Sequence, residues 1–180
     1  MGELAVFRAA SFQPGANSVR IDGENGALAG VLEMPDDAPR AYALFAHCFT
    51  CGKDFLPEKR ITRHLADRGI ATLRIDFAGL GKSEGEFKDS SFLTNLDDLV
   101  RAADWLGEHL AAPKLLVGHS LGGAMACRYA HDHADRVDGL VLLASYCDRS
   151  VSETSLRVLS VTGSADRVLN RDRYRATRSN

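Results

Sequence analysis

The sequence predicts an α/β fold, with a doubly wound, mostly parallel sheet, helices on both faces and an antiparallel hairpin at the N-terminal side. Short apolar runs of strand length alternate with segments of helical periodicity from residue 41 onward. These runs are apolar throughout, which is typical of parallel strands that are covered on both faces. Before residue 41, two strand-like segments flank Gly23-Glu24-Asn25-Gly26, a turn sequence that predicts a hairpin.

The elements follow one another regularly along the chain. The hairpin strands are expected at 18–22 and 27–35, the parallel strands at 41–47, 70–77, 114–120, 137–145 and 156–163, and the helices at 58–69, 96–110 and 121–133. Gly69 is expected to close the first helix. Apolar residues recur at spacings of three and four along the second helix, and Asp97 and Asp98 are expected in its first turn, where they favour the helix dipole.

Composition limits the class of protein. The chain has 180 residues, 45% hydrophobic and 26% charged, with a net charge of -2. We expect a single domain over 1–180 and no nucleic-acid binding, because a dedicated nucleic-acid binder is normally basic. No apolar stretch approaches the length of a membrane span, and the N-terminus lacks a signal-peptide pattern. Four cysteines without framework spacing predict a cytoplasmic location.

A candidate nucleophile lies between an apolar strand and a helix of small residues. The segment reads Gly118-x-Ser120-x-Gly122, the spacing of a nucleophile elbow. A turn this tight holds the serine in strained geometry, and side chains at 118 and 122 would collide with neighbouring backbone. The following helix aims its positive end at the site, where it favours developing negative charge.

From these residues onward the chain resembles the α/β-hydrolase family, over about residues 18–180. Asp76, Gly79, Gly81 and Ser83 are similar to that family's D-x-x-G-x-G-x-S turn. The stretch FAHCFTCGKDF resembles the hydrolase domains fused to osmotically inducible peroxide-reducing proteins, and the later half is similar to small esterase-like and dienelactone-hydrolase-like members. The resemblance implies a cofactor-free serine hydrolase. The connector at 146–155 is too short for a lid, which favours small carboxylic esters or thioesters as substrates.

The oxyanion hole and pocket follow from the elbow and the resemblance. Leu121, directly after the nucleophile, is expected to supply one backbone N–H. The family takes the second from the loop after the neighbouring strand, which implies Phe49 here. His47, Cys48 and Tyr146 are expected to line the substrate pocket. Cysteine at 48, where the family usually has glycine, makes Phe49 the less secure of the two donors.

The resemblance places the acid of a triad at Asp166, with Asp148 as the fallback. The base should be a histidine later in the chain, but all six histidines precede Asp166. His47 is interpreted as a structural hydrogen bonder and is the one stand-in base considered, since His119 should point away from the hydroxyl. We therefore expect a chain without the last strand, the last helix and the catalytic histidine. Such a chain would be a poor esterase, with an exposed edge strand that allows self-association.

Two alternatives remain open from the sequence. A non-catalytic member that binds a ligand at the same cleft would explain the absent base. A thiol-redox module would use Cys48-x-x-Cys51, which lies between a strand and a helix. No second CxxC or CxxH follows, so no metal site is predicted.

Overall fold

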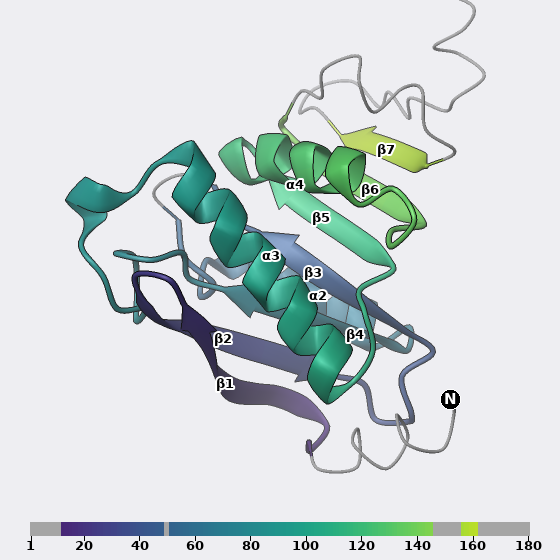
Figure 1. Cartoon of the computed structure of the whole chain (residues 1–180). Helices are drawn as coiled ribbons and strands as arrows, with labels where there is room; N and C mark the ends of the chain where they lie inside the picture. The colour runs from purple at the N-terminus through teal and green to yellow at the C-terminus, as the bar shows by residue number, and fades with distance from the viewer. Residues whose placement is uncertain (1–11, 49–50, 146–155, 162–180) are drawn as a thin grey trace, which may run out of the picture.

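A computed structural model describes residues 12–48, 51–145 and 156–161. One seven-stranded sheet runs through it, in the order β1-β2-β4-β3-β5-β6-β7 (Figure 1). The strands are β1 (Gly15–Gly23), β2 (Gly26–Met34), β3 (Ala41–Ala46), β4 (Ile70–Ile75), β5 (Leu115–His119), β6 (Gly139–Leu143) and β7 (Arg157–Val161). The helices are α2 (Leu56–Ala66), α3 (Phe92–His109) and α4 (Leu121–Asp132), with a short 3-10 turn η1 (Phe87–Asp89).

Strand directions confirm the predicted architecture. β1 and β2 form an antiparallel hairpin that closes between Gly23 and Gly26, and β2 pairs antiparallel with β4. From β4 across to β7, every neighbouring pair is parallel. Parallel neighbours need a crossover between them, and the helices supply it after β3, β4 and β5.

The helices cover both faces of the sheet, with α3 and α4 on one face and α2 on the other (Figure 1). The central strands are therefore buried on both sides, which is why their sequences are apolar throughout. The core combines strand residues with the inner faces of the helices. Its fully buried members include Leu44, Leu73, Leu99, Leu106 and Leu116. No helix in the described ranges is long and apolar enough to cross a membrane.

The start of α3 corrects one expectation. The helix begins at Phe92 and is capped by Ser91, whose hydroxyl accepts from the Thr94 N–H while the Thr94 hydroxyl accepts from the Ser91 N–H. Asp97 and Asp98 therefore lie beyond the first turn and do not act on the free N–H groups there. Asp98 is instead buried and accepts the Ala78 N–H at 2.8 Å, so it anchors the turn after β4.

Candidate active site

The carboxyl ends of three neighbouring strands bring the candidate residues together. β3 lies between β4 and β5, and its last residue, Ala46, pairs with Gly118. The loops after β3, β4 and β5 therefore leave the sheet at the same edge. This is the edge at which open α/β sheets bind their ligands.

Ser120 has the strained geometry that the sequence predicts for an elbow. It lies between β5 and α4 with φ 52° and ψ -117°, and the residue is exposed to solvent. A positive φ is unusual for a residue with a Cβ, and it costs about 1–3 kcal/mol that the surrounding structure must offset. Backbone bonds hold it: the Ser120 N–H donates to Leu143 O at 2.9 Å, and Ser120 O accepts from Gly123 N and from the Ser145 hydroxyl.

The two glycines of the motif allow α4 to pack against the sheet. A Cβ on Gly122 would overlap the carbonyl oxygens of Ala46 and His47, and one on Gly118 would overlap the backbone of Gly123. Both are backbone clashes, which a side-chain rotation cannot relieve. The close approach places the start of α4 directly against the loop that follows β3.

The Leu121 amide is the first N–H of α4, and its role as an oxyanion donor stays a prediction. Leu121 is the first residue of α4, so its N–H has no partner within the helix. The positive end of the α4 dipole adds to its effect on a developing negative charge. Phe49, the expected second donor, lies outside the described residues, so its assignment stays a prediction.

His47 is held on both sides of its ring. Nδ1 lies 2.6 Å from the carbonyl oxygen of Cys48, and the Phe77 N–H donates to Nε2 over 3.4 Å. The ring packs against Phe77 with centroids 4.6 Å apart, and only 1% of the residue is exposed. Burial lowers the pKa of His47, so the neutral ring is favoured. These contacts are those of a structural hydrogen bonder.

Of the other five histidines, three make contacts away from Ser120. The His119 ring stacks on Phe55, with Nδ1 3.5 Å from Glu58 Oε1. Two others, His109 and His133, face carbonyls of their own helices through Nδ1. The remaining two, His64 and His131, lie near the C-terminal ends of α2 and α4. Asp166, Asp148 and Tyr146 lie outside the described residues.

A buried ion pair that the sequence did not reveal fixes the loop after β3. Lys53 Nζ lies 2.6 Å from Asp76 Oδ2, and the Lys53 N–H donates to Asp76 Oδ1 over the same distance. Asp76 also accepts the Lys82 N–H at 2.9 Å, and its carbonyl accepts from the Ser83 hydroxyl. The D-x-x-G-x-G-x-S motif signalled Asp76, but nothing in the sequence pointed to Lys53. The pair ties the loop after β3 to the turn after β4.

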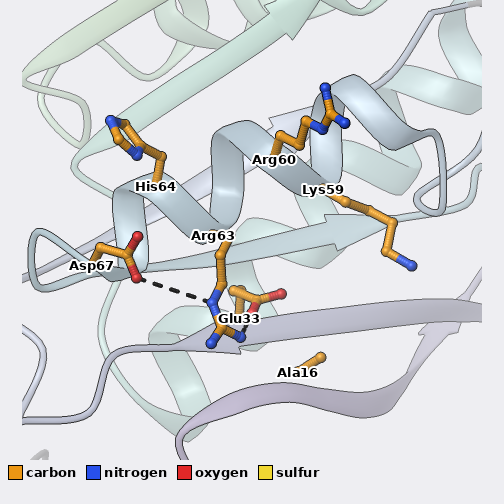
Figure 2. A pocket seen from close by; sticks show the side chains of 7 residues that line it. All are labelled: Ala16, Glu33, Lys59, Arg60, Arg63, His64 and Asp67. Atoms are coloured by element: carbon orange, nitrogen blue, oxygen red, sulfur yellow. Dashed lines mark hydrogen bonds and ion pairs between the residues drawn. The ribbon is translucent and has the colours of Figure 1, made fainter.

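Arg74 is a second buried cation, in contact with the backbone of Lys53. Arg74 donates to the Lys53 carbonyl and lies 3.2 Å from Glu33, which also contacts Arg63 at 3.3 Å. Arg63 lines a hollow on the flank of α2, where it also faces Asp67 (Figure 2). None of the residues that line this hollow belongs to the elbow or the loop after β3, so we do not assign it as the catalytic cleft.

Cys48 and Cys51 are joined by a disulfide in the structure, with their Cα atoms 5.2 Å apart. The turn that carries them is closed by a hydrogen bond from the Cys51 N–H to the Cys48 carbonyl at 3.1 Å. The sequence favoured two pocket cysteines without redox chemistry and left a redox pair as an alternative. A disulfide between the two cysteines is one of the two states that this alternative requires.

Glu58 is a residue that sequence analysis missed. It lies in the first turn of α2, and its side chain is 2% exposed. Burial raises the pKa of Glu58 to about 7, against a smaller opposing effect of Arg74. The backbone of Cys48 lies near enough to favour the charged form slightly, yet no hydrogen bond of ordinary geometry reaches either carboxylate oxygen. A glutamate in the first turn of a helix is usually exposed and interacts with the helix dipole, so the sequence gave no indication that Glu58 is buried.

The sheet, its crossover helices and a serine held at positive φ between β5 and α4 define an α/β hydrolase. Residues 38–178 match the family model described as serine aminopeptidase, S33. The chain belongs to this family.

Similar proteins include esterases and a thioesterase. A segment of 85 residues is 32% identical to the mitochondrial palmitoyl-protein thioesterase ABHD10 of Rattus norvegicus, covering 47% of this chain and 28% of that protein. The esterase domain of a Rhodothermus marinus protein is 36% identical with a TM-score of 0.59, over 74% of this chain and 54% of that one. An α/β serine hydrolase homologue from Coxiella burnetii is 21% identical with a TM-score of 0.74, over 92% and 82%, and supports the fold alone.

Proposed function

We propose that the protein hydrolyses small carboxylic esters or thioesters with Ser120 as the nucleophile. The observation that carries the proposal is the exposed Ser120 at φ 52° directly before α4. This geometry has a cost in stability, and such strain is typical of functional residues. The esterase and thioesterase relatives support the ester class.

The reaction begins when Ser120 Oγ attacks the substrate carbonyl carbon and the C=O π electrons move onto oxygen. The Leu121 N–H and the proposed Phe49 N–H donate to this oxyanion, and the α4 dipole stabilises it further. Collapse of the tetrahedral intermediate expels the alcohol or thiol and leaves an acyl-serine, which water then hydrolyses by the same route.

The serine proton must pass to a base, and Asp166 is proposed to orient that base. Four of the six histidines in residues 1–180 make contacts elsewhere, and the other two lie near the C-terminal ends of α2 and α4. His47 would have to give up contacts on both ring nitrogens to serve as the base. We therefore expect residues 1–180 by themselves to be slow, with a residual acceleration on the order of 10³–10⁴ over water from the oxyanion hole and binding.

A fluorophosphonate probe tests the nucleophile without requiring fast turnover. We expect covalent labelling of Ser120, read by peptide mass spectrometry, and its loss in Ser120→Ala. Slow release of p-nitrophenol from the acetate and butyrate esters should exceed that from the palmitate ester. Labelling at another serine would overturn the assignment of the nucleophile. Faster cleavage of an aminoacyl p-nitroanilide than of any ester would overturn the ester class.

The placement of the histidines favours a second candidate function, which is ligand binding without catalysis at the same edge of the sheet. In that case the probe would leave Ser120 unlabelled, while a non-hydrolysable ester analogue would still bind. Competition of that analogue with probe labelling separates the two functions, because only a reactive Ser120 can be protected.

A further inference from the structure

Two sulfurs and an imidazole meet beside the elbow. One ligand atom each from Cys48, Cys51 and His119 lie within 4.8 Å of one another. The cysteines follow β3, and His119 ends β5, so the parallel pairing of these strands creates the cluster. Two thiolates with a histidine are a donor set that Zn²⁺ favours over Mg²⁺ or Ca²⁺.

Glu58 provides an independent observation that favours a cation at this cluster. Its carboxylate is buried, neither oxygen has a hydrogen-bond partner, and Oε1 lies 3.5 Å from His119 Nδ1. A buried carboxylate in this condition is costly unless a positive charge or a donor is supplied nearby. Carboxylates commonly orient the histidines that bind zinc by accepting the N–H of the ring nitrogen that does not bind the metal. Glu58 Oε1 would take this role at His119 Nδ1 when Nε2 binds the metal.

We propose that Cys48, Cys51 and His119 form a Zn²⁺ site when the cysteines are reduced, with Glu58 as the residue that positions His119. The disulfide seen in the structure is the alternative state of the same pair. A dithiol such as dithiothreitol converts one state into the other. It gives two electrons and two protons to the Cys48–Cys51 bond and becomes a cyclic disulfide. Zn²⁺ then displaces both thiol protons into solvent and forms two Zn–S bonds.

The sequence alone predicted no metal because no second CxxC or CxxH follows the first. The third ligand is instead brought from β5 by the fold, and the fourth position is left for water or another small ligand. A metal here would link the loop after β3 to the residue directly before Ser120. It would act as a structural clamp on the elbow, and its binding does not depend on whether the protein hydrolyses esters.

The test uses Co²⁺ as a spectroscopic substitute for Zn²⁺ on the reduced, chelator-treated chain. We expect one Co²⁺ per chain, with the visible bands of tetrahedral Co²⁺ and a near-ultraviolet thiolate charge-transfer band, both removed by added Zn²⁺. The oxidised chain should show neither band. Cys51→Ser and His119→Gln should lose tight binding, and Glu58→Gln should weaken it by about 10–100-fold. His109→Gln, the same change at an exposed histidine on α3, is the matched control and should bind as the parent does.

Three results would overturn the proposal. The reduced chain could cycle between dithiol and disulfide without taking up Co²⁺, which would leave a redox pair only. It could bind Co²⁺ equally well after Cys51→Ser, or lose binding in His109→Gln. If circular dichroism shows that a variant fails to fold, the parent chain alone tests the proposal. Bound Zn²⁺ should slow the alkylation of its reduced Cys48 and Cys51 by iodoacetamide, as measured by peptide mass spectrometry.

Discussion

Lys53 and Asp76 form an ion pair of 2.6 Å between side chains that are 5% and 2% exposed. Burying two charges costs several kcal/mol of desolvation, and the pair is tolerated because Asp76 also accepts backbone N–H groups of Lys53 and Lys82. Its role is to fix the loop after β3 in one position relative to the turn after β4.

Removing one partner should therefore be strongly destabilising. We expect Asp76→Ala to lower the free energy of unfolding by about 3–5 kcal/mol, since it leaves the buried Lys53 ammonium with only the largely exposed Asp54 at 3.3 Å. Urea denaturation followed by circular dichroism measures this. Asp104→Asn, which breaks an exposed pair with Arg136, is the control and should cost less than about 1 kcal/mol. Equal effects for the two variants would show that the buried pair does not anchor the loop.

The glycine at 122 should tolerate no side chain. Gly122→Ala would place a Cβ against the carbonyl oxygens of Ala46 and His47, so α4 must move away from β3. We expect loss of probe labelling at Ser120 and destabilisation of more than about 2 kcal/mol. Gly107→Ala in α3 is the matched control, because its Cβ would meet no atom closer than 3.9 Å. That change should stabilise the helix by about 0.5–1 kcal/mol.

Strain at Ser120 can be separated from its chemistry. Ser120→Gly permits φ 52° without a Cβ, and we expect it to raise the free energy of unfolding by about 1 kcal/mol while abolishing probe labelling. Ser120→Ala also abolishes labelling but keeps the strained Cβ, so its stability should stay near that of the parent. Thermal unfolding of the three proteins side by side makes the comparison. A glycine variant no more stable than the alanine variant would mean that the turn stores no strain.

Asp98 should make stability depend on pH. Burial raises the pKa of Asp98 to about 6, against a smaller opposing effect of the Ala78 N–H. The unfolded value is near 3.9, so the folded chain binds the extra proton between about pH 4 and 6. The contribution of Asp98 to the free energy of unfolding is therefore fully present below pH 4 and is lost as the pH rises through 6. The loss amounts to at most about 3 kcal/mol.

We expect Asp98→Asn to remove this loss, since an amide oxygen can still accept the Ala78 N–H. The variant should match the parent near pH 4 and become progressively more stable than it up to pH 7, in urea titrations at each pH. Asp97→Asn removes the same charge from the helix surface and should change stability by at most about 1 kcal/mol. A constant difference between parent and Asp98→Asn across this range would contradict the assignment.

The sequence predicted the strands and the elbow because both leave local signals. Apolar runs of strand length mark β3 to β7, and glycines at 118 and 122 mark the tight turn around Ser120. It placed the start of α3 too late, because Ser91 and Thr94 form a capping box without the usual glutamate.

The rest of the site depends on contacts between segments that are distant in the sequence. In the sequence, Lys53 has the pattern of a surface lysine, but the fold places Asp76 at the end of β4 beside it. Glu58 has the pattern of an acid at a helix start, but the packing of α2 places it against His119. No residue pattern encodes such neighbours. They follow from the strand order, in which β3 is inserted between β4 and β5.

That strand order also constrains how the protein acquires its fold. β3 is made before both of its neighbours, so it has no edge to pair with until β4 has been synthesised, and its second edge stays open until β5 follows. Non-local parallel pairing of this kind is slow, because the intervening chain must close as a loop before any strand contact forms. A nascent chain would therefore carry a solvent-exposed apolar β3 edge through the synthesis of α3, and the elbow would acquire its geometry only after β6 supplies the Leu143 carbonyl.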